Sequence, residues 1–196
     1  MSEVKELQQR LDESEAKNRL NNWVAITVAI ISVFMAVSKV KDDNIVQAML
    51  QAKSDAVDSW NEYQAKKVKQ HMAELGLSQV EALQVLSPAR GGDVLLAQRK
   101  KYQENIVRYQ AEEDVLMKKA RGFEKLYDDL NYRDDQFDLS DASLSISLAM
   151  LAIVALTGKR RLLALAWFLA GFGMIMGLAG LLGLQLHPTA LTKLLS

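Results

Sequence analysis

The fold of this chain is decided by residues 162–186, which read LLALAWFLAGFGMIMGLAGLLGLQL. This stretch of 25 residues contains no Asp, Glu, Lys, Arg or His. A helix needs about 20 apolar residues to cross the roughly 30 Å hydrocarbon core of a bilayer. The stretch therefore predicts a transmembrane helix, which Pro188 would stop because proline disrupts a helix.

Two shorter apolar stretches, 23–38 and 142–157, also lack ionisable side chains. The first reaches spanning length if Lys39 extends its ammonium to the interface, and the second if its helix starts at Leu139. A buried helix of a soluble protein competes with each interpretation, and a cleaved signal peptide competes for the first. Residues 1–21 are long and acidic for a signal peptide, which favours an uncleaved span.

The average composition hides these stretches, because 49% hydrophobic residues and a balance of 24 basic and 24 acidic residues are ordinary for a soluble domain. Zero net charge, without a basic stripe interleaved with aromatics, argues against a nucleic-acid partner. The chain has no cysteine, which excludes disulfides, thiol catalysis and thiolate metal sites.

A densely charged insert separates the first and second apolar stretches. Residues 39–75 contain neither proline nor glycine and predict one helix, which Gly76 ends. A capping-box pattern then opens a short helix over 78–86, and residues 87–92 predict a turn. Asp93 caps a second long helix. We expect the two long helices to pair as an antiparallel hairpin.

Large side chains recur at strict seven-residue intervals along the second long helix. The series is Leu95, Tyr102, Tyr109, Leu116, Phe123 and Leu130. Three further residues complete part of the same seam: Ile106, Ala120 and Tyr127. Charged Arg99 and Glu113 occupy two other seam positions. The pattern is typical of coiled-coil packing along a partner helix, which the sequence places either in the same chain or in another copy.

We therefore expect an all-α membrane protein with three transmembrane helices and a long, coiled-coil-like antiparallel hairpin between the first and second. The expected segments are a polar N-terminal helix or tail at 1–21, the first span at 22–40, the hairpin domain at 41–138, the second span at 139–157, a short basic loop at 158–161, the third span at 162–186 and a C-terminal tail at 187–196.

Small residues recur every three or four positions along each span and so share one helix face. They are Ala25, Ala29, Ser32 and Ala36 in the first span, Ser145, Ala149 and Ala152 in the second, and Ala166, Ala170, Gly173, Gly177 and Gly180 in the third. Small faces let helix backbones approach closely in lipid. We expect these faces to pack the spans together, and the third, with five members, to contact a neighbouring copy as well.

Lysine and arginine near the spans predict the orientation, since these residues favour the cytoplasmic side. The loop 158–161 reads GKRR, and the N-terminal flank carries Lys17 and Arg19. If both are cytoplasmic, an odd number of crossings puts the hairpin on the far side, which is periplasmic in a bacterium. Lys39 and Lys41 favour the opposite orientation.

Few residues are candidates for chemistry, and the candidate metal ligands are His71, Glu74, Asp134, Asp135 and Asp138. The first two lie three apart on one helix and could share an ion. The three aspartates could form a cation ring in an oligomer or pair with Lys39 and Lys41. Two histidines are too few for a di-metal bundle, and no nucleotide-binding or hydrolase motif occurs. We expect no catalytic site and no cofactor.

Three short strings carry a resemblance to a known family: NWVA at 22–25, KVKDDN at 39–44 and WNEYQAK at 60–66. With them the chain resembles an uncharacterised family of bacterial multi-pass membrane proteins, classed as a domain of unknown function, over nearly its whole length. The resemblance implies a bacterial membrane setting and brings no activity or site residue.

We expect a homo-oligomeric scaffold of the bacterial inner membrane, which contacts the lipid bilayer and can bind a protein partner through the hairpin. An oligomeric channel or transporter subunit whose pore forms on assembly is the alternative. The spans lack ionisable groups, which weighs against proton or ion relays at membrane depth. An enzyme is disfavoured because no nucleophile or acid-base constellation is present.

Overall fold

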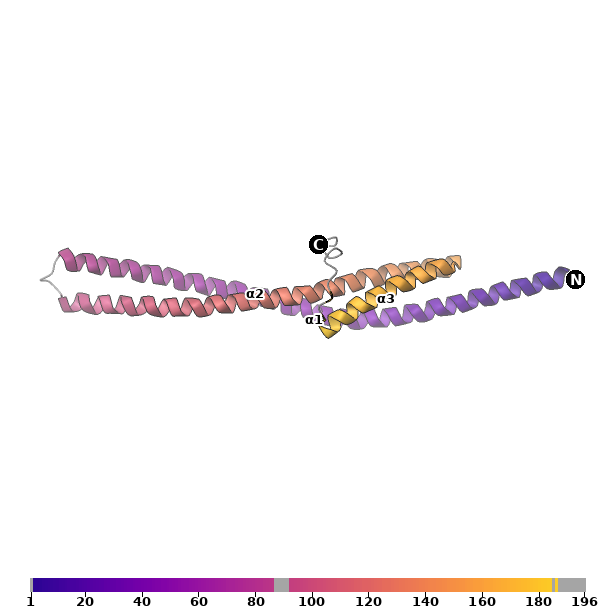
Figure 1. Ribbon diagram of the computed structural model, residues 1–196, viewed down its shortest axis with the longest axis horizontal. Coiled ribbons are helices and arrows are strands. Elements are labelled where there is room, and N and C mark those ends of the chain that lie inside the picture. The colour runs from indigo at the N-terminus through magenta and orange to yellow at the C-terminus, as the bar shows by residue number, and fades with distance from the viewer. Residues whose placement is uncertain (1, 87–91, 185, 187–196) are drawn as a thin grey trace. The chain divides into compact units, whose positions relative to one another are not determined.

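The computed structural model describes residues 2–86, 92–184 and 186, and the side chains from Val4 onward. These described residues form three α-helices: α1, Ser2–Leu86; α2, Gly92–Thr157; and α3, Arg160–Leu182 (Figure 1). Within these ranges no residue is in a strand. The all-helical fold expected from the sequence is confirmed.

The helices are longer than the expected segments, because spans and hairpin arms are not separate helices. α1 has 85 residues and α2 has 66, so each carries both an apolar stretch and a charged arm. The expected helix end at Gly76 is wrong, as is the new helix start at Ser78, since α1 continues through both. Of the expected turn, Gly92 belongs to α2 and the other residues lie outside the described part of the chain. The tail 187–196 also lies outside it.

Gly76 stays helical because its missing side chain makes room for a ring on α2. A Cβ on Gly76 would lie 2.6 Å from Cζ of Tyr102. Apolar contacts continue beyond the glycine on the same face, where Leu77 is half-buried and Val80 is buried. Burial of these side chains outweighs the roughly 1 kcal/mol that glycine costs in a helix interior relative to alanine.

The third helix is shifted relative to the expected span, since it starts at Arg160 and ends at Leu182. Only Gly158, with a left-handed φ of 67°, and Lys159 connect it to α2. Gly183 follows the helix with a φ of 68°, and its N–H donates to the carbonyl of Ala179. This left-handed glycine ends the helix before the proline that was expected to stop it.

The chain folds into two compact units. The first, which we call the span unit, consists of Met1–Gln47 and Leu130–Ser196. The second, the hairpin unit, consists of Ala48–Asp129. α1 and α2 contribute to both units, whereas α3 belongs to the span unit.

The span unit has an apolar core to which all three helices contribute. Its members are Leu20, Val24, Ile31, Leu144, Leu151, Val154, Leu163, Ala166 and Ala170. Two serine hydroxyls of α2 donate hydrogen bonds to carbonyl oxygens of α3, Ser143 to Leu169 at 2.8 Å and Ser147 to Ala166 at 2.7 Å. Ser147 therefore bonds to a neighbouring helix rather than to its own backbone, and these bonds fix α3 against α2.

The hairpin unit is an antiparallel pair formed by the arms of α1 and α2 (Figure 1). As residue numbers rise along α1, those of the contacting residues fall along α2. The cross-helix pairs are Lys53 with Tyr127, Trp60 with Glu124, Lys66 with Glu112, Gly76 with Tyr102 and Glu81 with Arg99. The Trp60 indole N–H donates to Glu124 at 2.8 Å, and Arg99 and Glu81 are 3.2 Å apart. The pairing is thus polar at its edges.

Each of the three helices is long and apolar enough, by length and composition, to cross a membrane. The most apolar window of α1 is 17% buried within the chain, whereas those of α2 and α3 are each 39% buried. The first apolar stretch is therefore the least covered by the rest of the chain.

Candidate functional site

A group of polar side chains lies in the span unit beside the ends of its apolar stretches. We call this group the polar collar and define it as Ser38, Lys39, Asp42, Arg133, Asp134, Gln136, Asp138 and Ser140. Its α1 members begin at Ser38, the last residue of the first apolar stretch, and its α2 members precede the second. Helical spacing puts Ser38 and Asp42 on the face of α1 that carries buried Ile31 and Ile45, so these polar groups are buried with that face.

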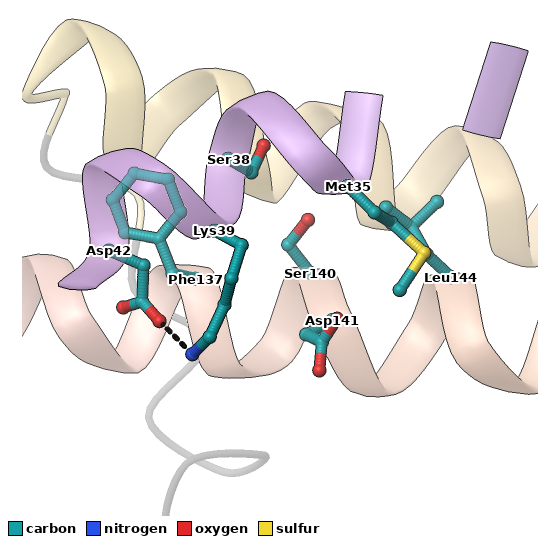
Figure 2. Close-up of a pocket in the computed structure, with 8 residues that line it drawn as sticks. All are labelled: Met35, Ser38, Lys39, Asp42, Phe137, Ser140, Asp141 and Leu144. Carbon is teal, nitrogen blue, oxygen red and sulfur yellow. Dashed lines mark hydrogen bonds and ion pairs between the residues drawn. The ribbon is translucent and has the colours of Figure 1, made fainter. Parts of the chain in front are cut away.

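A small pocket lies within the collar, between α1 and α2 (Figure 2). Its volume of about 20 Å³ is room for about one water molecule. The lining residues are Met35, Ser38, Lys39, Asp42, Phe137, Ser140, Asp141 and Leu144. The pocket is therefore too small for an organic substrate, which needs hundreds of cubic ångströms.

Asp42 is the most deeply buried acid of the collar, at 6% exposure. Its Oδ2 accepts a hydrogen bond from the Lys39 ammonium at 2.8 Å (Figure 2), and the same ammonium lies 3.3 Å from Asp43. Lys39 keeps most of its side chain exposed, so it reaches the acid from the solvent side. The expected pairing of Lys39 with the α2 aspartates is replaced by ion pairs within α1.

Acidic side chains of both helices lie near one another in the collar. The charges of Asp138 and Asp135 on α2 and of Asp42 on α1 act on Asp134. Partial burial, followed by the charge of Asp138, raises the pKa of Asp134 to about 6. Burial and the charge of Asp42 also raise the pKa of Asp138, which Lys39 partly offsets. The pKa values of these two collar carboxyls therefore lie above the ordinary value of 3.8.

Arg133 bonds to the C-terminal end of α3, and Gln136 bonds to residues that follow the helix. The Arg133 guanidinium donates to the carbonyl of Gly180 from Nη2 at 2.9 Å and from Nε at 3.3 Å. The Gln136 amide donates to the carbonyls of Leu184 and Leu186, each at 2.7 Å. Carbonyls at a helix end lack helical partners and carry partial negative charge, so the Arg133 cation stabilises that end, while the Gln136 amide pairs two carbonyls beyond it.

Glycines on α3 allow the close approach that this arrangement needs. A Cβ on Gly177 would lie 2.7 Å from both the Ser140 hydroxyl and the Phe34 ring. A Cβ on Gly173 would lie 2.7 Å from Leu144, and one on Gly180 would lie 2.9 Å from Phe137. α3 therefore packs against the same turns of α2 that carry the collar.

The third small-residue face is buried within the chain, whereas the other two are exposed. Its members Ala166, Ala170, Gly173, Gly177 and Gly180 are all buried. The exposed small residues are Ala25, Ala29, Ser32 and Ala36 on α1 and Ser145, Ala149 and Ala152 on α2.

In the hairpin unit, the seven-residue series lies on the side of α2 that faces α1. Its five members in this unit, Leu95, Tyr102, Tyr109, Leu116 and Phe123, are half-buried, as is Leu130 in the span unit. Between them, Ala120 is fully buried and Glu113 is 9% exposed.

The candidate metal ligands do not converge. His71 Nδ1 lies 3.0 Å from Glu74 Oε2, and that carboxylate also accepts from Gln70 at 2.8 Å. The hydrogen bonds from His71 and Gln70 lower the pKa of Glu74, as expected of a surface carboxylate with two donors. Within the described residues, no three His, Cys, Asp or Glu side chains are grouped to hold a metal ion.

Sequence reasoning missed Ser38, Asp42, Arg133, Gln136 and Ser140 as site residues. A signal for Asp42 was present, because Ile31, Ser38 and Ile45 recur every seven residues and predict a buried face that Asp42 shares. No comparable signal marks Gln136, whose role depends on where the end of α3 lies.

These features define an all-helical protein with three helices apolar enough to span a membrane and a polar collar that joins them. Residues 20–183 match the model of the family described as a domain of unknown function, DUF4337, and the chain belongs to that family. Neither the curated proteins nor the solved structures contain a match to the chain.

Proposed function

We propose that this protein is a homo-oligomeric membrane scaffold without a catalytic site. The observation that carries the proposal is the uncovered small-residue face of the first apolar stretch. On α1, Ala25, Ala29 and Ala36 point away from the buried residues Val24 and Ile31. Lipid gives apolar helices no hydrophobic reason to associate, so small faces that permit close backbone contact are the surfaces on which helices pair.

The corresponding face of α2 supports the same proposal. Ser145, Ala149 and Ala152 are exposed on the side of α2 opposite to buried Ser147 and Val154. The five-member face of α3, which we expected to contact a neighbouring copy, is covered by α2 and by Phe34 of α1. We therefore assign contacts between copies to the small faces of α1 and α2.

The hairpin unit offers a second surface for association. On the side of α1 opposite to the α2 arm, four apolar side chains are between 51 and 67% exposed: Val68, Met72, Leu75 and Leu83. Contiguous exposed apolar residues on a helix outside the lipid are typical of protein interaction surfaces. This stripe supports a role in which the hairpins bind one another, as a coiled coil, or bind a partner protein.

We propose a bacterial inner-membrane location with a cytoplasmic N-terminus and a periplasmic hairpin unit. The support is the cluster Lys159, Arg160 and Arg161 between α2 and α3, together with Lys17 and Arg19 before the first span. A single cysteine replacing Asn105 tests this orientation, since the chain has no other cysteine. Labelling by an impermeant thiol reagent in intact spheroplasts is expected, and protection there would contradict it.

The oligomer is tested by native mass spectrometry of the protein in lipid nanodiscs or mild detergent. The wild type is expected to form a discrete oligomer, and Ala29→Leu to shift it towards monomer because a larger side chain separates the helices. Val37→Leu is the matched control, since Val37 is an exposed, already large residue of the same span. A monomeric wild type, or equal effects of the two variants, would contradict the proposal.

The channel alternative differs from the scaffold in that it predicts ion flux across the membrane. A pore built on the small faces of α1 and α2 would be lined by alanine and by the hydroxyls of Ser32 and Ser145. Ion flux into liposomes that contain the wild-type oligomer would favour the channel. An oligomer without flux of ions or small solutes would favour the scaffold.

A further inference from the structure

We propose that a cavity between α1 and α3 binds one anionic phospholipid, with the headgroup phosphate at Arg19 and Arg160 and an acyl chain along Trp167. The cavity lies within the span unit, at the end where α1 enters its apolar stretch. The ligand is a lipid of the surrounding bilayer, so the proposal rests on the membrane location proposed above. It does not depend on oligomerisation, because one chain supplies every lining residue.

The first support is the cavity itself, whose volume of about 400 Å³ is typical of pockets that hold organic ligands. Its lining includes Arg19, Leu20 and Trp23 from α1 and Arg160, Leu163 and Trp167 from α3. Trp23 is 58% exposed and Trp167 is 44% exposed, so the cavity is open along one side. It can therefore take a headgroup and part of one chain while the rest of the lipid stays in the bilayer.

The second support is the order of charged and apolar groups along the cavity. The two helices run in the same direction, because Trp167 contacts Thr27 and, further along both helices, Gly177 lies against Phe34. On each helix the arginine comes first, and the tryptophan follows after four residues on α1 and seven on α3. At 1.5 Å per residue the tryptophans lie roughly 6–10 Å deeper in the apolar stretches. A bilayer lipid has the same order, from phosphate to chain.

The third support is the inner wall of the cavity, where two indole rings are fixed against each other. The rings of Trp23 and Trp167 meet edge to face, with their centroids 6.2 Å apart. The Trp167 N–H donates to the hydroxyl of Thr27 at 3.1 Å. Because the polar atom of Trp167 is bonded within the chain, the exposed part of its ring offers apolar surface to a hydrocarbon chain.

The arginines at the outer end are available to a phosphate. Among the residues that the structure describes, Arg160 has no ion-pair partner, and Arg19 lies 3.8 Å from Glu15 with both side chains largely exposed. Such an exposed ion pair contributes little, so it competes weakly with a ligand. Lys17 and Glu13 line an adjoining cavity that shares Arg160, which leaves the region with net positive charge. Arginine binds phosphate oxygens through paired N–H donors.

The test is native mass spectrometry of the full-length protein in mild detergent, titrated with phosphatidylglycerol or phosphatidylcholine. We expect higher occupancy by phosphatidylglycerol at equal concentration, because the site is positively charged and this lipid carries net negative charge. Arg160→Gln should weaken phosphatidylglycerol binding by about fivefold, the effect of one basic residue on attraction to an anionic lipid. Arg161→Gln is the matched control, since it removes the same charge from a neighbour that does not line the cavity.

A second comparison tests the apolar part of the site. Trp167→Ala should weaken phosphatidylglycerol binding, whereas Phe168→Ala should not, since Phe168 is 73% exposed and lies outside the cavity. Arg19→Gln keeps the test valid if Trp167→Ala disturbs the packing, because the exposed Arg19 side chain can be replaced without changing the core. Arg19→Gln should weaken binding as Arg160→Gln does. Inorganic phosphate at the lipid concentration should not displace the lipid, because it has no chain.

Three results would overturn the proposal: equal occupancy by the two lipids, equal weakening by Arg160→Gln and Arg161→Gln, or displacement of the lipid by inorganic phosphate. Equal weakening would show that the lipid is attracted by the basic loop in general rather than held in the cavity. The same spectra report the oligomeric state, so the lipid site and the scaffold can fail separately. A monomer that distinguishes the two lipids would support the site and contradict the scaffold.

Discussion

The ring of Phe34 on α1 lies so close to Gly177 on α3 that a Cβ on the glycine would come within 2.7 Å of its Cε1 atom. The Ser140 hydroxyl of α2 lies at the same distance from that position. Gly177 is therefore the point at which all three helices of the span unit meet, and its close contact lies within one chain.

Gly177→Ala is expected to destabilise the span unit by about 1–3 kcal/mol, since the added methyl group has no space and the core must shift. Gly171→Ala is the control, because nothing lies within 4 Å of a Cβ there. Thermal unfolding in detergent would compare the two. An oligomer that dissociates while the monomer keeps its Tm would show instead that Gly177 contacts a neighbouring copy.

Gln136→Leu should loosen the residues that follow α3. The substitution removes the donor to the carbonyls of Leu184 and Leu186 but keeps a similar side-chain volume. Leaving such groups unpaired costs about 1–3 kcal/mol. Hydrogen exchange at the Gly183 and Leu184 amides should accelerate, whereas the exposed control Gln103→Leu should leave it unchanged.

Gly76→Ala is expected to destabilise the hairpin unit, although alanine is normally the better helix former by about 1 kcal/mol. The reason is the Tyr102 ring, which a Cβ at Gly76 would meet at 2.6 Å. Gly122→Ala is the matched control, since that helical glycine has nothing within 4 Å and should gain stability. A double variant with Tyr102→Ala should recover part of the loss, and an increase in stability from Gly76→Ala alone would refute the packing role.

The hairpin unit should respond to acid in the opposite sense to the collar. The hydrogen bond from Lys66 lowers the pKa of Glu112, and the hydrogen bond from His71 lowers that of Glu74. A lowered pKa in the folded chain contributes stability above the ordinary value of 4.5 that is lost as pH falls through the folded value. The protection of the hairpin-unit amides relative to their intrinsic exchange rates should therefore decrease as pH falls below the ordinary value of 4.5, and less so in Glu112→Gln. An equal loss of protection in both proteins would exclude this ion pair as a cause.

The helical character and the three apolar stretches followed from the sequence because they depend on composition and local periodicity. Helix boundaries were harder to predict, since Gly76 resembles a helix stop unless the ring of Tyr102 opposite to it is known. The collar could not be predicted from the sequence either, because its residues come from distant parts of the chain. Asp42 and Asp134 are 92 positions apart in the chain, and only the way in which the faces of α1 and α2 meet brings them together.

The contact between Gly76 and Tyr102 also decides which alignment the two arms adopt. A series that repeats every seven residues is ambiguous, because sliding one arm by seven positions superposes the repeat on itself. Such a slip would put Tyr102 opposite Lys69 or Leu83, where a side chain fills the space that Gly76 leaves open. The space left by the absent side chain of Gly76 accommodates only the Tyr102 ring, and this fit selects one register of the two arms from several with similar apolar contacts.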